Sequence, residues 1–147
     1  MKRYTVNLGL IGEYFLLYEL ARRGINGLKM PDYLNFDLLL KNGIRIEVKT
    51  STIQLDVSKK YKEAKNPISS KREIYCFHIR KNQKECDVFV LIGLNKNLNV
   101  DRLFIIPKEI IGNRKCISIP INSKKTHHRY GDYENRWDII TTDGNNI

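Results

Sequence analysis

The sequence lacks several features that would assign it to common protein classes. It has no run of 18 apolar residues, which excludes a membrane-spanning helix, and its first residues lack the long apolar core of a signal peptide. It also lacks a Gly-rich phosphate-binding loop and a nucleophile elbow, which excludes the hydrolases that depend on them. Internal repeats and an interdomain linker are absent as well. We therefore expect a cytoplasmic protein that folds as a single domain over residues 1–147.

Cysteine is scarce and odd in number. Cys76, Cys86 and Cys116 are widely spaced and lie mostly within apolar runs. That pattern predicts reduced core residues and neither a zinc site nor a disulfide framework. The adjacent His127 and His128 have no third ligand at a diagnostic spacing, so we expect a phosphate contact or exposure to solvent for them.

Acidic residues are few relative to basic ones, 16 against 26, so the formal net charge is +10. An excess of this size favours a polyanionic partner, and nucleic-acid phosphate is the partner we expect. Biased codon usage or heat adaptation would give a similar composition without such a partner. The excess is concentrated in two segments that we expect to be loops, 58–72 and 122–136. Their candidate nucleic-acid-binding residues are Lys59, Lys60, Lys62, Lys71, Arg72, Lys124, Lys125 and Arg129.

The hairpin-like segment 36–49 separates apolar from charged residues by parity, and alternate side chains of a strand share a face. The apolar face consists of Phe36, Leu38, Leu40, Ile44, Ile46 and Val48. The opposite face carries Asp37, Arg45, Glu47 and Lys49. A two-residue loop would mix the two faces. A three-residue loop, with Gly43 at positive φ, pairs Leu40 with Ile44 and keeps the apolar face whole, so we adopt that register.

This register places Asp37 directly across from Glu47, with Cβ atoms about 5 Å apart. Two facing carboxylates repel each other unless a positive charge lies between them, and a divalent cation with oxygen ligands is the natural occupant. Lys49 adds an ammonium group two residues along the same face. The alternative interpretation is an ordinary solvent-facing set of charges, in which Arg45 and Lys49 merely neutralise the acids.

A helix is predicted over residues 7–23, with Asn7 as N-cap and Gly24 ending it. Its predicted core stripe consists of Leu10, Tyr14, Leu17, Leu20 and Ala21. Glu13 lies on that stripe, where an unpaired carboxylate is costly, so it needs a partner. A metal ion is one candidate partner, and a salt bridge to Lys49 or Arg45 is the other.

These residues resemble the PD-(D/E)XK nuclease superfamily, which has a restriction-endonuclease-like core. The matching strings are Gly12-Glu13, Leu20-Ala21-Arg22-Arg23-Gly24, Phe36-Asp37-Leu38 and Ile46-Glu47-Val48-Lys49-Thr50-Ser51. Their order is especially similar to that of archaeal Holliday-junction resolvases and of small intron-encoded or host endonucleases. The resemblance covers about the first third of the chain. The proline that precedes the aspartate in the superfamily is absent, since Asn35-Phe36 stand there.

The resemblance implies an α/β fold with a mixed central β-sheet flanked by helices, and hydrolysis of DNA phosphodiester bonds with Mg²⁺ or Mn²⁺. The implied catalytic residues are Glu13, Asp37, Glu47 and Lys49. The implied metal ligands are Asp37, Glu47, the backbone carbonyl of Val48, and Glu13 through water or on a second ion. Lys49 would orient or help deprotonate the attacking water. Gln54 is a weaker candidate for an accessory contact.

Three functions remain open at this point. The first is a DNA endonuclease, expected as a homodimer because one active site cuts one strand. The second is a resolvase of Holliday junctions or other branched DNA. The third is a nucleic-acid-binding module that keeps the fold without the chemistry, and the intact set of acids and lysine argues against it.

The remainder of the chain is predicted to be mainly strands. Strands are predicted over residues 73–80, 87–94, 102–106 and 115–121. A helical turn is predicted over residues 107–111 and ends at Gly112. Residues 135–140 are expected to pack the C-terminal end, with Trp137 covering core.

Overall fold

The computed structural model describes residues 5–56, 72–80, 85–122 and 128–141. Among these residues, no helix is both long and apolar enough to cross a membrane. The described elements, in chain order, are α1 (Leu8–Arg22), β1 (Gly27–Lys29), β2 (Leu38–Leu40), β3 (Arg45–Asp56), β4 (Arg72–His78), β5 (Val88–Leu94), β6 (Val100–Pro107), α3 (Lys108–Ile111), β7 (Cys116–Pro120), the 3₁₀ helix η4 (Gly131–Tyr133) and α4 (Asp138–Thr141).

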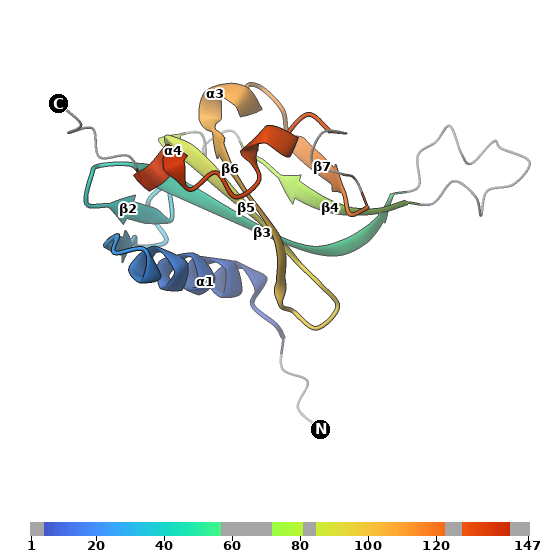
Figure 1. Cartoon of the computed structure of the whole chain (residues 1–147), viewed down its shortest axis with the longest axis horizontal. Helices are drawn as coiled ribbons and strands as arrows, with labels where there is room; N and C mark the ends of the chain where they lie inside the picture. The colour runs from blue at the N-terminus through green and yellow to red at the C-terminus, as the bar shows by residue number, and fades with distance from the viewer. Residues whose placement is uncertain (1–4, 57–71, 81–84, 123–127, 142–147) are drawn as a thin grey trace, which may run out of the picture.

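Strand β3 is the longest strand and joins two sections of a mixed seven-stranded sheet (Figure 1). Its first residues pair antiparallel with β2, and residues 46–52 pair in parallel with β5. Strands β1 and β6 extend this section at its two ends. The last residues of β3, from Ile53, pair antiparallel with β4, which in turn pairs with β7. The mixed sheet expected from the sequence is therefore confirmed.

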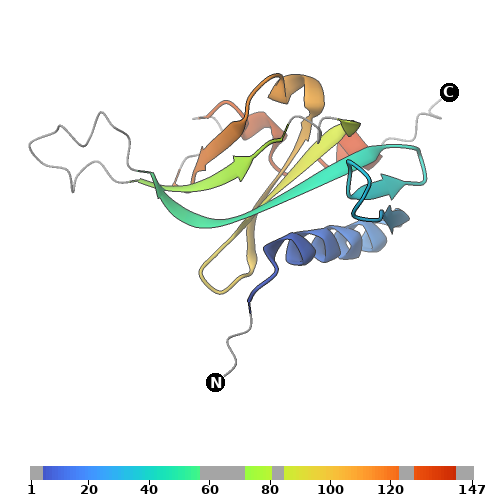
Figure 2. The same cartoon turned by 180° about the vertical axis from the view of Figure 1, so that it is seen from behind.

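Two apolar cores lie on the two faces of β5. Val88 and Val90 point into the first core, which includes Leu16 and Leu20 of α1. Phe89 and Leu91 point into the second core, which β4 and β7 cover. Figure 2 shows α1 on one side of β3 and the β4–β7 pair on the other. Every residue of β5 is buried, which explains its nearly continuous apolar sequence.

The β2–β3 hairpin has the predicted register. Leu38 pairs with Ile46, the Leu40 amide donates to the Ile44 carbonyl over 2.9 Å, and Gly43 has a φ of 87°. One part of the prediction is wrong, because Phe36 packs against the second core and not against the first. The chain leaves the strand at Asp37, so Phe36 does not continue the apolar face of Leu38.

Helix α1 begins and ends as predicted, but it packs through a different face. The Asn7 side chain accepts a hydrogen bond from the Leu10 amide, and Gly24 follows the helix at a φ of 74°. The predicted stripe is wrong for Tyr14, whose side chain is 58% exposed, and for Ala21, which is also exposed. The buried residues are Gly12, Leu16 and Leu20. These residues recur every four positions, and the lack of a side chain at Gly12 leaves room for the Thr50 and Val48 side chains of β3.

The other predicted elements are present with small shifts. The four predicted strands correspond to β4, β5, β6 and β7, and the predicted turn corresponds to α3, followed by Gly112 at a φ of 58°. Trp137 packs against the first core as expected, and the Arg23 guanidinium lies 4.1 Å from the centre of its ring. Strand β1, which pairs with β2, was not predicted.

Candidate active site

The candidate site lies along one edge of β3. Strand β2 pairs with this edge through Ile46, and β4 pairs with it from Ile53 onward. Strand β5 occupies the opposite edge over residues 46–52. Between β2 and β4, residues 47–52 therefore have no strand partner on this edge among the described residues. In this gap, side chains in place of a neighbouring strand can contact the β3 backbone in the middle of the sheet.

Asp37 lies at the start of the gap, where the chain enters β2. Its Oδ2 accepts a hydrogen bond from the Val48 amide over 2.8 Å, in the place where a continued β2 would have offered a carbonyl. The amide and carbonyl of one strand residue point toward the same edge. The Val48 carbonyl therefore faces the gap on the side of the Asp37 carboxylate.

Glu47 and Lys49 project from β3 next to Asp37. Lys49 Nζ lies 3.6 Å from Glu47 Oε1, and their side chains are only 18% and 6% exposed, respectively. Burial, and then the negative charge of Asp37, raise the pKa of Glu47 to about 8 in spite of Lys49. Burial also lowers the pKa of Lys49. The ammonium therefore does not compensate fully for the two acids.

Glu13 reaches the same place from α1. Burial, followed by the charge of Asp37 and a hydrogen bond to it, raises the pKa of Glu13 to about 7. Its ion-pair partner is Lys29 of β1, with Nζ at 3.6 Å from Glu13 Oε2. The alternative partners expected from the sequence, Lys49 and Arg45, are not the ones observed. Arg45 instead forms hydrogen bonds and an ion pair with Asp87 at the start of β5.

Asp37 is the common neighbour of Glu13 and Glu47, so the structure brings the predicted acids and the predicted lysine together. A cavity of about 220 Å³ borders this cluster, and Asp37, Glu47 and Arg80 contribute to its lining. A second cavity of about 440 Å³ borders Lys49, and Arg80 and Gln54 also line it. Arg80 therefore lies beside both openings.

Sequence reasoning missed Lys29 and Arg80 as members of the site. Lys29 belongs to a three-residue strand, which is too short to show a period of two. Arg80 follows β4, and only the pairing of β4 with the far end of β3 brings it near Lys49. Lys29 and Arg80 are both cationic, as expected at a site where the charges of three acids must be balanced.

The donor set of this cluster suits a hard divalent cation. Three carboxylates and the Val48 carbonyl offer oxygen ligands, which Mg²⁺ and Mn²⁺ prefer. Burial and the charge of Asp37 raise the pKa of Glu13 to about 7 and that of Glu47 to about 8, so both carboxylates favour a nearby positive charge. A bound cation would supply that charge.

Most of the predicted nucleic-acid-binding residues fall outside the described part of the chain. These residues are Lys59, Lys60, Lys62, Lys71, Lys124 and Lys125. Arg72 is described and forms an ion pair with Asp56 at 2.9 Å, while Arg129 is exposed.

The His128 side chain is in a different environment from the one predicted. Both of its ring nitrogens are buried without a hydrogen-bond partner among the described residues, and its ring lies edge-on to Phe104 at 5.6 Å. The expectation of a phosphate-contacting or solvent-exposed side chain is therefore wrong for His128, because its ring packs against Phe104 of the second core. His127 lies outside the described residues.

All three cysteines are free, but only Cys86 is the buried core residue that the sequence predicts. Cys116 is exposed and Cys76 is partly buried. Both are on the face of the β4–β7 pair that points away from the second core, because the alternate residues Tyr75, Phe77 and Ile117 point into it.

The mixed seven-stranded sheet with helix α1 packed against it defines an α/β fold. The solved structure of a bacterial homing endonuclease, I-Ssp6803I, matches this chain with a TM-score of 0.64 and 18% sequence identity. The match covers 90% of this chain and 88% of that chain. At this identity the likeness is one of fold. No family model matches the chain, and neither does any curated protein.

Proposed function

We propose that this protein is a metal-dependent DNA endonuclease built on the restriction-endonuclease-like core of the PD-(D/E)XK superfamily, with all 147 residues in a single domain. The observation that carries this proposal is the meeting of Glu13, Asp37, Glu47 and Lys49 at one gap in the sheet. The fold shared with a homing endonuclease supports it, as does the net charge of +10, which suits a polyanionic substrate.

In this proposal Asp37 and Glu47, together with the Val48 carbonyl, hold Mg²⁺ or Mn²⁺, and Glu13 binds it through water or holds a second ion. When bound, the cation stabilises negative charge on the phosphoryl oxygens and lowers the pKa of water. Asp37 has a fixed orientation, because its Oδ2 also accepts a hydrogen bond from the Val48 amide. Burial of Glu47 keeps its carboxylate in one place. Burial also raises the pKa of this carboxyl group, so its charged form depends on a nearby cation.

Lys49 positions the attacking water and stabilises charge as it develops on the phosphate. Its ammonium is held near Glu47 and is mostly shielded from solvent, which strengthens its interaction with an anion. Arg80 is placed to contact a phosphate group, because it lines both cavities beside the acids.

The decisive experiment is a plasmid-nicking assay with and without Mg²⁺. We expect Asp37→Asn to reduce nicking about a hundredfold or more, because it removes a charged ligand yet keeps an acceptor for the Val48 amide. Asp87→Asn is the matched control, since Asp87 pairs with Arg45 away from the acid cluster, and it should retain activity. Equal nicking by wild type and Asp37→Asn would refute the assignment of the site.

The alternatives give different results in the same assay. DNA binding without metal-dependent cleavage would identify a binding module that lacks the chemistry. Preferential cleavage of a four-way junction over linear duplex of matched sequence would identify a junction resolvase. A homodimer, which we propose because each active site cuts one strand, should appear in sedimentation as twice the 17.3 kDa chain mass.

A further inference from the structure

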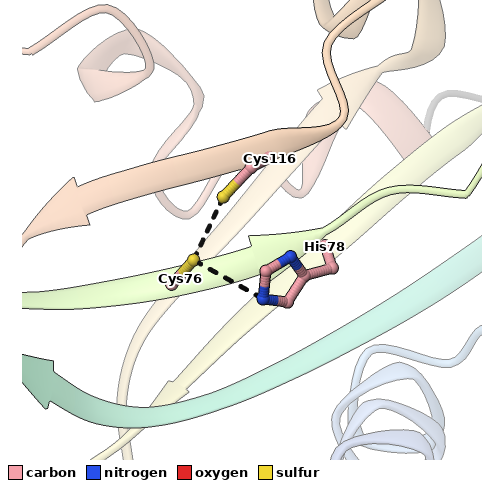
Figure 3. Close-up of side chains that lie close together, drawn as sticks. All are labelled: Cys76, His78 and Cys116. Carbon is pink, nitrogen blue, oxygen red and sulfur yellow. Dashed lines mark hydrogen bonds between the residues drawn. The ribbon is translucent and has the colours of Figure 1, made fainter.

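A second cluster of metal-binding side chains lies outside the acid site. Cys76 and His78 are two residues apart on β4, and Cys116 of β7 pairs directly with His78. All three side chains therefore share one face of the strand pair. Figure 3 shows the sulfurs of Cys76 and Cys116 turned toward each other and the His78 imidazole turned toward Cys76.

The distances within this cluster are close to those of a tetrahedral zinc site. The two sulfurs are 3.1 Å apart, and Cys76 Sγ lies 3.9 Å from His78 Nε2. Zinc–sulfur bonds of about 2.3 Å and zinc–nitrogen bonds of about 2.0–2.1 Å at tetrahedral angles separate two sulfurs by about 3.8 Å and a sulfur from a nitrogen by about 3.6 Å. Small side-chain rotations are sufficient to reach these values, since all candidate ligand atoms lie within 4.8 Å of one another.

A disulfide fits this arrangement less well. Cys76 pairs with Ser118 and Cys116 with His78, so the two cysteines are diagonal neighbours on the strands. Diagonal neighbours in an antiparallel pair are about 7–8 Å apart, whereas disulfides usually join residues with Cα atoms up to about 6.8 Å apart. A disulfide between the two cysteines would also give no reason for the His78 imidazole to lie close to the Cys76 sulfur.

The surroundings leave a position for a fourth ligand. Cys76 and His78 line the cavity of about 440 Å³ that also borders Lys49. Ser118 pairs directly with Cys76 across the two strands, so its side chain lies on the same face as the three candidate ligands. A water molecule from the cavity can therefore complete a four-coordinate shell.

We propose that Cys76, His78 and Cys116 bind one Zn²⁺ ion, with water as the fourth ligand, and that the ion links β4 to β7. Binding converts the two thiols to thiolates and releases two protons, and His78 coordinates as a neutral imidazole. Thiolate and imidazole ligands select zinc over Mg²⁺ and Mn²⁺, which the carboxylates of the acid site prefer. The chain thus carries two metal sites of different chemistry, and the zinc site does not depend on nuclease activity.

Titration of the reduced, metal-free protein with Co²⁺ tests this proposal. We expect a thiolate-to-cobalt charge-transfer absorption that saturates at one ion per chain and disappears when Zn²⁺ is added. Excess Mg²⁺ should not change it, because cobalt bound by the oxygen ligands of the acid site has no thiolate band. Zn²⁺ should also raise the midpoint of thermal unfolding.

Substitution of the cysteines identifies which of them bind the metal ion. Cys116 is exposed, so Cys116→Ser should fold normally and reduce the thiolate band to about half, in proportion to the number of thiolates. Cys76→Ser combined with Cys116→Ser should abolish the band and the thermal shift. Cys86→Ala is the control, because Cys86 is buried in the second core and should not affect the band.

Three results would overturn the proposal. The first is the absence of a thiolate band at saturating Co²⁺ in the reduced wild-type protein. The second is a band that survives removal of both cysteines. The third is a band in Cys86→Ala that is weakened as much as in Cys116→Ser. None of these outcomes bears on Mg²⁺-dependent cleavage, so failure of the zinc site can be distinguished from failure of the proposed nuclease.

Discussion

The contact between Gly12 of α1 and Thr50 of β3 holds Glu13 at the acid cluster, and Gly12→Ala tests it. A Cβ atom on residue 12 would lie 2.0 Å from Thr50 Oγ1 and 3.3 Å from both Thr50 Cβ and Val48 Cγ1. Restoring an ordinary contact of 3.4 Å to the oxygen requires a shift of about 1.4 Å. Thr50 is β-branched and stiff, so most of this shift falls on the helix.

Gly12→Ala has two opposing effects on the free energy of unfolding, and their magnitudes decide whether the variant is more or less stable than the wild type. Alanine improves intrinsic helix stability by about 1 kcal/mol over glycine. Overpacking of a tight interface costs about 1–3 kcal/mol, and a contact of 2.0 Å belongs in the upper part of that range. After the helix gain is subtracted, we expect a net loss of about 1–2 kcal/mol in the free energy of unfolding, and reduced nicking because Glu13 moves away from Asp37.

Denaturant unfolding measures this loss, and Gly9→Ala on the same helix is the matched control. Its new Cβ meets nothing closer than Asn7 Oδ1 at 3.6 Å, so it should be neutral or stabilising. Adding Thr50→Ala to Gly12→Ala should restore stability, because it removes the clashing hydroxyl, which has no hydrogen-bond partner among the described residues. Equal stability of Gly12→Ala and Gly9→Ala, or no coupling between residues 12 and 50, would refute the reasoning.

Two further predictions concern the acids and the lysine. Without metal, the free energy of unfolding should fall as pH rises from about 4.5 to 8, because the raised pKa values of Glu13 and Glu47 let the native state bind more protons than the unfolded state. A rise of the Glu47 pKa from 4.5 to about 8 bounds its share of this loss at about 5 kcal/mol. Mg²⁺ should restore stability at pH 8, Glu47→Gln should flatten the profile, and an unchanged profile in that variant would contradict the assignment. Lys49→Met should abolish nicking but retain stabilisation by Mg²⁺; loss of both would show that Lys49 serves the fold or metal binding.

The sequence is sufficient to predict the hairpin that carries Asp37 and Glu47, because its register depends on local features. The alternation of apolar and charged residues has a period of two, and Gly43 permits the positive φ that a three-residue loop needs. Phe36 is the exception, because the strand ends at Asp37 and the position of the preceding residue depends on the second core. That core is assembled from strands distant in the sequence.

The packing face of α1 could not be predicted in the same way. Apolar residues occur around most of this helix, so periodicity alone does not select one face. The selection depends on Gly12, whose lack of a side chain matters only because Thr50 lies opposite it. Similarly, Cys76 and Cys116 meet only through the register of β4 with β7, and no local pattern in the sequence reports that register.

The acid cluster is difficult to explain as a feature that stabilises the fold. Glu47 is buried next to a second carboxylate, and its only ion-pair partner among the described residues is a lysine whose own pKa is lowered by burial. An apolar residue in its place would avoid both the desolvation and the repulsion. Local conflicts of this kind occur where a site must bind a ligand, because the ligand removes the conflict. The energetic cost of Glu47 in the metal-free protein is therefore itself an argument that the gap along β3 has a cationic ligand.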